Sequence, residues 1–115
     1  MKNDLPCPAC GFETLEDSYG SYVICDVCGW EDDGVQLANP CSNGGANRES
    51  LSEAQEKAMA KYPMSVQVTE GFKRNKRWRP LNSREKENYT KQLKEKHWSN
   101  KATLYESEVY WNVDS

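Results

Sequence analysis

The chain has 115 residues, of which 37% are hydrophobic, and its mean hydropathy is −0.95. This length has room for one domain, and no apolar run approaches the roughly 20 residues that a membrane-spanning helix needs. The net charge of −3 is unevenly distributed: residues 1–72 carry four Lys/Arg and twelve Asp/Glu, whereas residues 73–101 carry eleven and three. These values argue against a membrane-spanning protein and predict an acidic first part beside a basic second part.

Two Cys-x-x-Cys pairs, each followed directly by glycine, form the strongest motif: Cys7 with Cys10, and Cys25 with Cys28. Zinc takes four donors in a tetrahedron, with Zn–S bonds of about 2.3 Å, and one tight Cys-x-x-Cys turn delivers two of them. The glycine lets the backbone turn with positive φ, so that amide groups point back at the sulfurs. The spacing predicts a zinc ribbon with one structural Zn²⁺ in a closed site of four cysteines, which leaves no position for a substrate.

The cysteines also allow other interpretations. A disulfide framework is disfavoured because the count of five is odd and the first residues include no apolar leader. Iron stays an alternative to zinc, since four thiolates also hold a single iron ion. Cys41 is interpreted as a loop cysteine without a role. The alternative is a nucleophile, whose partner would be the single histidine, His97, far along the chain. We therefore expect a cytoplasmic protein with a structural metal and no enzyme activity.

The residues around the second cysteine pair predict a ribbon strand and an acidic turn. Residues 21–25 are β-branched and aromatic, and residues 12–15 are the expected antiparallel partner. Trp30 is expected to pack over the metal site and shield it from water. The three carboxylates that follow are interpreted as a solvated acidic turn that caps nearby amides, with a hard-metal site or acid–base chemistry as alternatives: Glu31, Asp32 and Asp33.

Two helices are expected in the second half. Ser50 with a glutamate three residues later matches a capping box, and Pro63 ends the helix that follows. Asn82 is the expected N-cap of a helix over residues 83–98. Residues 64–69 alternate apolar and polar side chains as a short strand does. Residues 103–113 fit a strand or a helix, and we favour the strand.

The segment from Lys73 to Arg79 places five cations around Trp78. Clustered cations with an aromatic ring are typical of single-stranded nucleic acid binding, through phosphate contact and base stacking. The other interpretation is a linker whose tryptophan packs on the core while its arginines pair with the acidic half. The sequence pI of about 5.2 favours the linker.

Several of these motifs, taken in order, resemble the cysteine-rich CPCC family of bacterial proteins over residues 5–60. One departure is Ala9, which stands where the family's namesake motif has a cysteine. The resemblance implies a metal-binding ribbon and little else, although small members found beside bacterial toxin genes suggest a cognate immunity protein. The residues that carry it are Cys7-Pro-x-Cys10-Gly-Phe-x-Thr-Leu15, Tyr22-x-Ile-Cys25-x-Val-Cys28-x-Trp30-Glu-Asp-Asp33, Gln36, Asn39-Pro40, Gly45-Ala-Asn47 and Ser50-Leu51-x-x-Ala54.

Together these features predict a small α+β fold, in which an N-terminal zinc-ribbon β-hairpin precedes two helices and a C-terminal strand. Residues 1–46 form the ribbon and residues 47–115 a helical, basic and aromatic extension packed with it as one domain. The predicted function is a non-catalytic protein-interaction module that inhibits a toxin or enzyme; nucleic-acid binding through residues 73–101 is the alternative. The candidate partner surface comprises Glu31, Asp32, Asp33, Arg74, Arg77, Trp78, Arg79 and Trp111.

Overall fold

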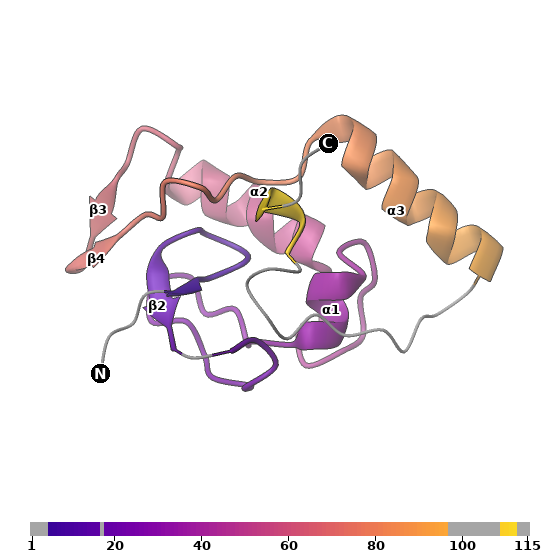
Figure 1. Ribbon diagram of the computed structural model, residues 1–115, viewed down its shortest axis with the longest axis horizontal. Helices are drawn as coiled ribbons and strands as arrows, with labels where there is room; N and C mark the ends of the chain where they lie inside the picture. Colours follow the sequence, from indigo (N-terminus) through magenta and orange to yellow (C-terminus); the bar gives the residue numbers. More distant parts are fainter. Residues whose placement is uncertain (1–4, 17, 97–108, 113–115) are drawn as a thin grey trace.

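The structure is a computed structural model that describes residues 5–16, 18–96 and 109–112. It confirms the small α+β class, with short strands and three α-helices (Figure 1). Within the described part, no helix is long and apolar enough to cross a membrane. The elements in chain order are β1 Leu5–Pro6, β2 Glu13–Leu15, α1 Gly34–Ala38, α2 Leu51–Lys61, β3 Val68–Thr69, β4 Phe72–Lys73, α3 Ser83–Lys96 and the 3₁₀ turn η2 Tyr110–Asn112.

The predicted pairing of residues 12–15 with residues 21–25 is wrong. Strand β2 pairs antiparallel with β1, with Leu15 opposite Leu5. Residues 21–25 instead pair with residues 30–32, through a bridge between Ile24 and Glu31. Each Cys-x-x-Cys-Gly turn folds the chain back on its own flanks, and closing such a short loop costs less entropy than joining the two turns.

Local capping signals fix the helices. Ser50 accepts from the backbone N–H of Glu53, whose side chain accepts from the Ser50 N–H, so the predicted capping box is confirmed. Asn82 and Glu85 form the same reciprocal pair at the start of α3. The short helix α1 was not predicted; it begins after Asp33, whose carboxylate accepts from two amides of its first turn.

The expected strand over residues 64–69 is reduced to β3, which forms a tight hairpin with β4. Glu70 and Gly71 connect the two strands with φ of +49° and +86°, so both turn residues are left-handed. A two-residue turn of this kind matches the twist of the strands that it joins. Glu70 is an unusual residue for that position, which is why the sequence did not indicate the hairpin.

The expected C-terminal strand is also wrong for its described part. Residues 109–112 form a bend and the turn η2, and Trp111 is buried there. The remainder of that segment, together with His97 and Trp98, lies outside the described residues.

One hydrophobic core joins the cysteine-containing segment to the later part of the chain. Trp78 and Trp111 belong to the same buried cluster as Phe12 and the first cysteine pair. Hydrogen bonds cross the same boundary, since Gln55 donates to the carbonyl of Pro8 and accepts from an amide 26 residues further on. The first Cys-x-x-Cys turn lies against α2 and the extended chain that precedes α3, since Gln55 of α2 bonds to Pro8 and the Asn75 N–H donates to the Gly11 carbonyl at 2.8 Å.

Candidate metal centre

The two Cys-x-x-Cys-Gly segments adopt the same hydrogen-bonded turn. In each, the N–H of the first cysteine donates to the carbonyl five residues later, and the glycine N–H donates back to the first cysteine's carbonyl. We call these turns the first and second knuckle, residues 7–12 and 25–30. The donor–acceptor distances are 2.9 Å for Cys7 to Phe12, 2.8 Å for Gly11 to Cys7, 2.8 Å for Cys25 to Trp30 and 3.0 Å for Gly29 to Cys25.

Both glycines are left-handed, as the sequence predicted, with φ of +81° at Gly11 and +83° at Gly29. Their surroundings differ. A Cβ atom on Gly11 would lie 2.2 Å from the ring of Trp78, whereas one on Gly29 would meet nothing within 4 Å. The first knuckle therefore needs glycine for its backbone and for the space above it, and the second for its backbone alone.

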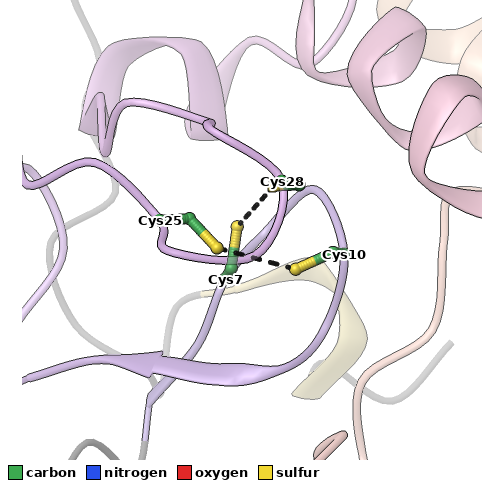
Figure 2. A group of neighbouring side chains, drawn as sticks. All are labelled: Cys7, Cys10, Cys25 and Cys28. Carbon is green, nitrogen blue, oxygen red and sulfur yellow. Dashed lines mark hydrogen bonds between the residues drawn. The ribbon is translucent and has the colours of Figure 1, made fainter. Parts of the chain in front are cut away.

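The knuckles bring four sulfur atoms together (Figure 2). The Sγ atoms of Cys7 and Cys28 are 3.6 Å apart, those of Cys10 and Cys25 are 3.8 Å apart, and all four lie within 4.8 Å of one another. Four sulfurs placed tetrahedrally at about 2.3 Å from a zinc ion would be about 3.8 Å apart. All four are free thiols. The predicted ligand residues thus form a cluster that could hold a metal ion.

Neighbouring donors favour the charged form of one thiol in particular. The hydroxyl of Thr14 donates to Cys25 Sγ at 3.1 Å, and the Val27 N–H donates to the same atom at 3.4 Å. The hydrogen bond from Cys10, followed by those from the other cysteines and Thr14, lowers the pKa of Cys25. Burial raises the pKa of the Cys7 thiol well above its usual range, so a bound cation would have to compensate for that thiolate's lost hydration.

The exposure of the four cysteines is unequal. Cys7, Cys10 and Cys25 are buried, and Cys28 is partly exposed. Cys28 borders a cleft of about 150 Å³ between the second knuckle and α2. Trp30, which was expected to shield the metal site, is buried and lines this cleft together with Tyr62 and Lys61. Solvent reaches the cluster from the side of the second knuckle.

The acidic turn caps nearby amides, as expected, since the Asp33 carboxylate accepts from two amides of α1, but its expected solvation is wrong for Asp32 and Asp33. Asp32 is fully buried and accepts from the N–H and the hydroxyl of Ser21 at 2.9 and 2.7 Å. Asp33 is buried as well. Its carboxylate accepts hydrogen bonds from the first turn of α1 and from the N–H of Ala46. These two carboxylates organise the chain after the second knuckle and do not face a partner. Glu31 is half-buried and keeps an accessible side chain.

Arg74 and Trp78 of the basic segment turn inward, whereas its two lysines are exposed. The burial of Trp78 contradicts its predicted base-stacking role. Its ring is buried, and its indole N–H donates to the Pro8 carbonyl at 3.2 Å. Arg74 is buried over the ring of Phe12, and its guanidinium donates to four backbone carbonyls, including that of Cys10 at 3.0 Å. The core packing expected for Trp78 in a linker is confirmed. Arg74 does contact the acidic part of the chain, residues 1–72, but through backbone carbonyls and not through acidic side chains.

The remaining candidate residues divide between surface and core. Arg77 is exposed, and Arg79 pairs with Glu85 at 2.6 Å within the basic part of the chain. Trp111 is buried and packs edge-on against Tyr19, so it is not available to a partner. The thiol of Cys41 lies 3.6 Å from the Lys86 carbonyl, away from the four-cysteine cluster.

The loop that follows α1 is stabilised by hydrogen bonds from two polar side chains, Gln36 and Asn47. The sequence did not indicate this role. Gln36 is buried and donates to three backbone carbonyls of residues 42–49. Asn47 donates to Glu31 and accepts from its N–H, so its amide lies alongside the second knuckle. Both residues belong to the resemblance described above, although nothing in their spacing indicates these contacts.

Comparison with protein families identifies the family of the chain. A family model described as cysteine-rich CPCC matches residues 5–74. The matched segment contains both knuckles, α1, α2 and the hairpin of β3 and β4, and it ends at Arg74. No curated protein matches the chain. The expected family resemblance is confirmed, and it extends beyond the residues that suggested it.

Proposed function

The chain belongs to the cysteine-rich CPCC family, and we propose that it is a non-catalytic module in which zinc holds the two knuckles together for binding another protein. The observation that carries this proposal is the cluster of four thiols at tetrahedral spacing. Four thiolates satisfy a zinc ion completely, so the metal would act on stability and not on a substrate. The ligands are Cys7, Cys10, Cys25 and Cys28.

Zinc is the proposed metal because the donor set is all thiolate and the domain is small. Few residues in the described part belong to regular strands. Such a domain gains much of its stability from the metal, which binds only when both knuckles are folded. Iron would bind the same sulfurs but would colour the protein.

Metal analysis of the purified full chain tests this step. We expect one zinc per chain in wild type and in Cys41→Ser, and loss of bound zinc in Cys28→Ser. Cys41 is the matched control because it is the fifth thiol and lies outside the cluster. A coloured protein with one iron per chain would replace zinc, and metal retained in Cys28→Ser would remove this cysteine from the site.

We further propose that the protein partner is a toxin and that the chain is its cytoplasmic immunity protein. The acidic balance of residues 1–72, −8, would favour a basic partner such as a nuclease. The polar network of Asp32, Asp33 and Asn47 would keep the surface around the second knuckle rigid.

Native mass spectrometry of the tagged chain purified from its own host tests the partner. We expect a stoichiometric complex with one protein, and we expect that protein to arrest growth when it is expressed alone but not with this chain. A stoichiometric partner that is harmless alone would contradict the immunity role while leaving the binding module intact. A metal-bound chain without any protein partner would contradict both.

A further inference from the structure

The hairpin that carries the second knuckle has one edge that the chain itself closes. The N–H of Glu31 donates to Asn47 Oδ1 at 2.9 Å, and Asn47 Nδ2 donates to the Glu31 carbonyl at 2.8 Å. The asparagine amide thus takes the place of a neighbouring strand. An edge covered in this way cannot pair with another chain.

The opposite edge is left open at Ile24. Ile24 and Glu31 form an antiparallel bridge, flanked by hydrogen bonds from Cys25 N–H to the Trp30 carbonyl and from Asp32 N–H to the Val23 carbonyl. In this kind of pair, the N–H and C=O of both residues point away from each other. Those of Glu31 meet Asn47, whereas those of Ile24 have no hydrogen-bond partner among the described residues.

Three consecutive apolar side chains surround this open position. Tyr22, Val23 and Ile24 are 59%, 51% and 59% exposed. We call these three residues the outer edge. An open edge with exposed apolar side chains is a feature that folded proteins usually avoid, because it invites pairing with another chain.

Tyr22 adds a backbone outlier to the outer edge. Its φ is +62°, a conformation that residues with a Cβ rarely adopt, and its N–H donates to the Asp32 carbonyl at 2.9 Å. Buried Asp32 fixes this arrangement from inside through Ser21. The strained backbone places a large ring in solvent at the end of the open edge, a cost without a compensating contact in the described chain.

We propose that the outer edge is the docking site for an extended segment of another protein, which adds as a strand beside Ile24. This inference rests on the proposed binding function and gives it a location. Strand addition uses main-chain hydrogen bonds for affinity and alternate side chains for specificity. The segment therefore has apolar residues at alternate positions, which cover the side chains of the outer edge.

The charges around the edge select the partner. Asp26 is exposed and Glu31 is half-buried, and both flank the outer edge in the hairpin. A second copy of the chain would bring a second acidic hairpin against the first, and residues 18–34 contain no lysine or arginine that could pair with these carboxylates, which is unfavourable. A segment with lysine or arginine beside its apolar residues complements them. The occupant is thus a strand of a different protein, in which apolar residues alternate with lysine or arginine.

Phage-displayed random peptides of about ten residues, long enough for one strand, are the probe. They are selected on the purified full chain with its metal, and the binding of selected peptides is then measured on variants. Ile24→Pro removes the outward N–H without breaking a hydrogen bond of the described fold. Tyr22→Gly removes the ring and suits the positive φ. Val68→Thr, at an equally exposed apolar residue of β3, is the control.

We expect selected peptides to alternate apolar residues with lysine or arginine. Their affinity should fall about tenfold or more in Ile24→Pro and in Tyr22→Gly, and stay unchanged in Val68→Thr, because one main-chain hydrogen bond or one packed ring is lost. The melting temperature and bound metal of each variant verify that it is folded. If Ile24→Pro is unfolded, the peptide affinity of Tyr22→Gly decides the test.

Equal binding of the peptides to wild type and to the folded edge variants overturns the proposal, and so does a selection that enriches no peptide. A dimer of the wild type that Ile24→Pro abolishes overturns it in favour of a second copy. If the partner isolated from the host binds wild type and both edge variants equally, this location is wrong and the proposed binding function stands. If peptides bind the edge but the host provides no protein partner, the edge stands and the proposed function fails.

Discussion

The first and second knuckles share a turn and differ in what covers them. Cys7, Cys10 and Phe12 of the first knuckle are fully buried, whereas Cys28 and Gly29 of the second are at least partly exposed. Both turns have the same hydrogen bonds, so the motif does not determine the burial. The first knuckle anchors the rest of the chain, and the second leaves an edge open. One repeated sequence element thus supplies both a core and a surface.

The largest effect should come from a change that removes the link between the knuckles. Cys25→Ser deletes the thiol that lies at the centre of the hydrogen-bond pattern, accepting from Thr14 and Val27. Structural zinc contributes on the order of 10 kcal/mol, so we expect the variant to lose its metal and its cooperative unfolding transition. Circular dichroism with zinc analysis measures both.

Cys41→Ser is the control for this experiment and should unfold like wild type, since Cys41 lies outside the cluster. A Cys25→Ser variant that still unfolds cooperatively would show that the packing of the first knuckle suffices without metal.

Alanine at the two glycines compares the knuckles directly. Both substitutions place a Cβ on left-handed backbone, at a cost of about 1 kcal/mol. In Gly11→Ala the Cβ also meets Trp78 at 2.2 Å, so the ring has to move and we expect a total loss of about 4 kcal/mol. In Gly29→Ala the backbone cost alone remains. Urea denaturation gives the two free energies of unfolding; equal losses would mean that Trp78 adapts without cost.

The cover of the first knuckle can be removed at Arg74. Its guanidinium donates to the carbonyls of Cys10, Tyr62, Pro63 and Val66. Arg74→Met keeps the length of the side chain but leaves buried carbonyls without donors, so we expect a loss of about 3 kcal/mol.

The exposed Arg77 supplies the matched variant, Arg77→Met, which should change the free energy of unfolding by less than about 0.5 kcal/mol. Thermal unfolding of both variants distinguishes them. A small loss in Arg74→Met would indicate that water replaces the guanidinium and that the first knuckle is less tightly covered than its burial implies.

Sequence reasoning succeeded where a local rule decides the structure. Each Cys-x-x-Cys turn, the positive φ at Gly11 and the capping pair of Ser50 and Glu53 depend on residues a few positions apart. The joining of the two turns was predicted because one metal ion needs four ligands. Sequence reasoning failed where distant residues decide. The charge of Asp32 indicated a solvated turn, and that of Arg74 indicated nucleic acid or an acidic side chain as its partner. Both residues are buried, because Ser21, 11 positions earlier, donates to Asp32, and the Cys10 carbonyl, 64 positions earlier, accepts from Arg74.

Sequence reasoning therefore does not predict which distant residue a side chain will contact. Trp78 is an example, since its ring fills space above a glycine 67 positions earlier. No periodicity encodes such a contact. The open edge at Ile24 has the same origin, because Asn47 covers one side of the hairpin and the chain provides no equivalent for the other in its described part.

The smallest expected effect concerns the backbone of the second knuckle. Tyr22→Gly relieves a left-handed residue, worth about 1 kcal/mol, and this offsets the larger entropy of glycine in the unfolded chain, about 0.5–1 kcal/mol. We therefore expect its free energy of unfolding to stay within about 0.5 kcal/mol of wild type. Val23→Gly lacks this relief, since Val23 has a negative φ, and should lose about 1 kcal/mol. Urea denaturation measures the difference. Equal losses would mean that the Tyr22 ring stabilises the fold itself, so that the strain of its backbone is compensated within the chain.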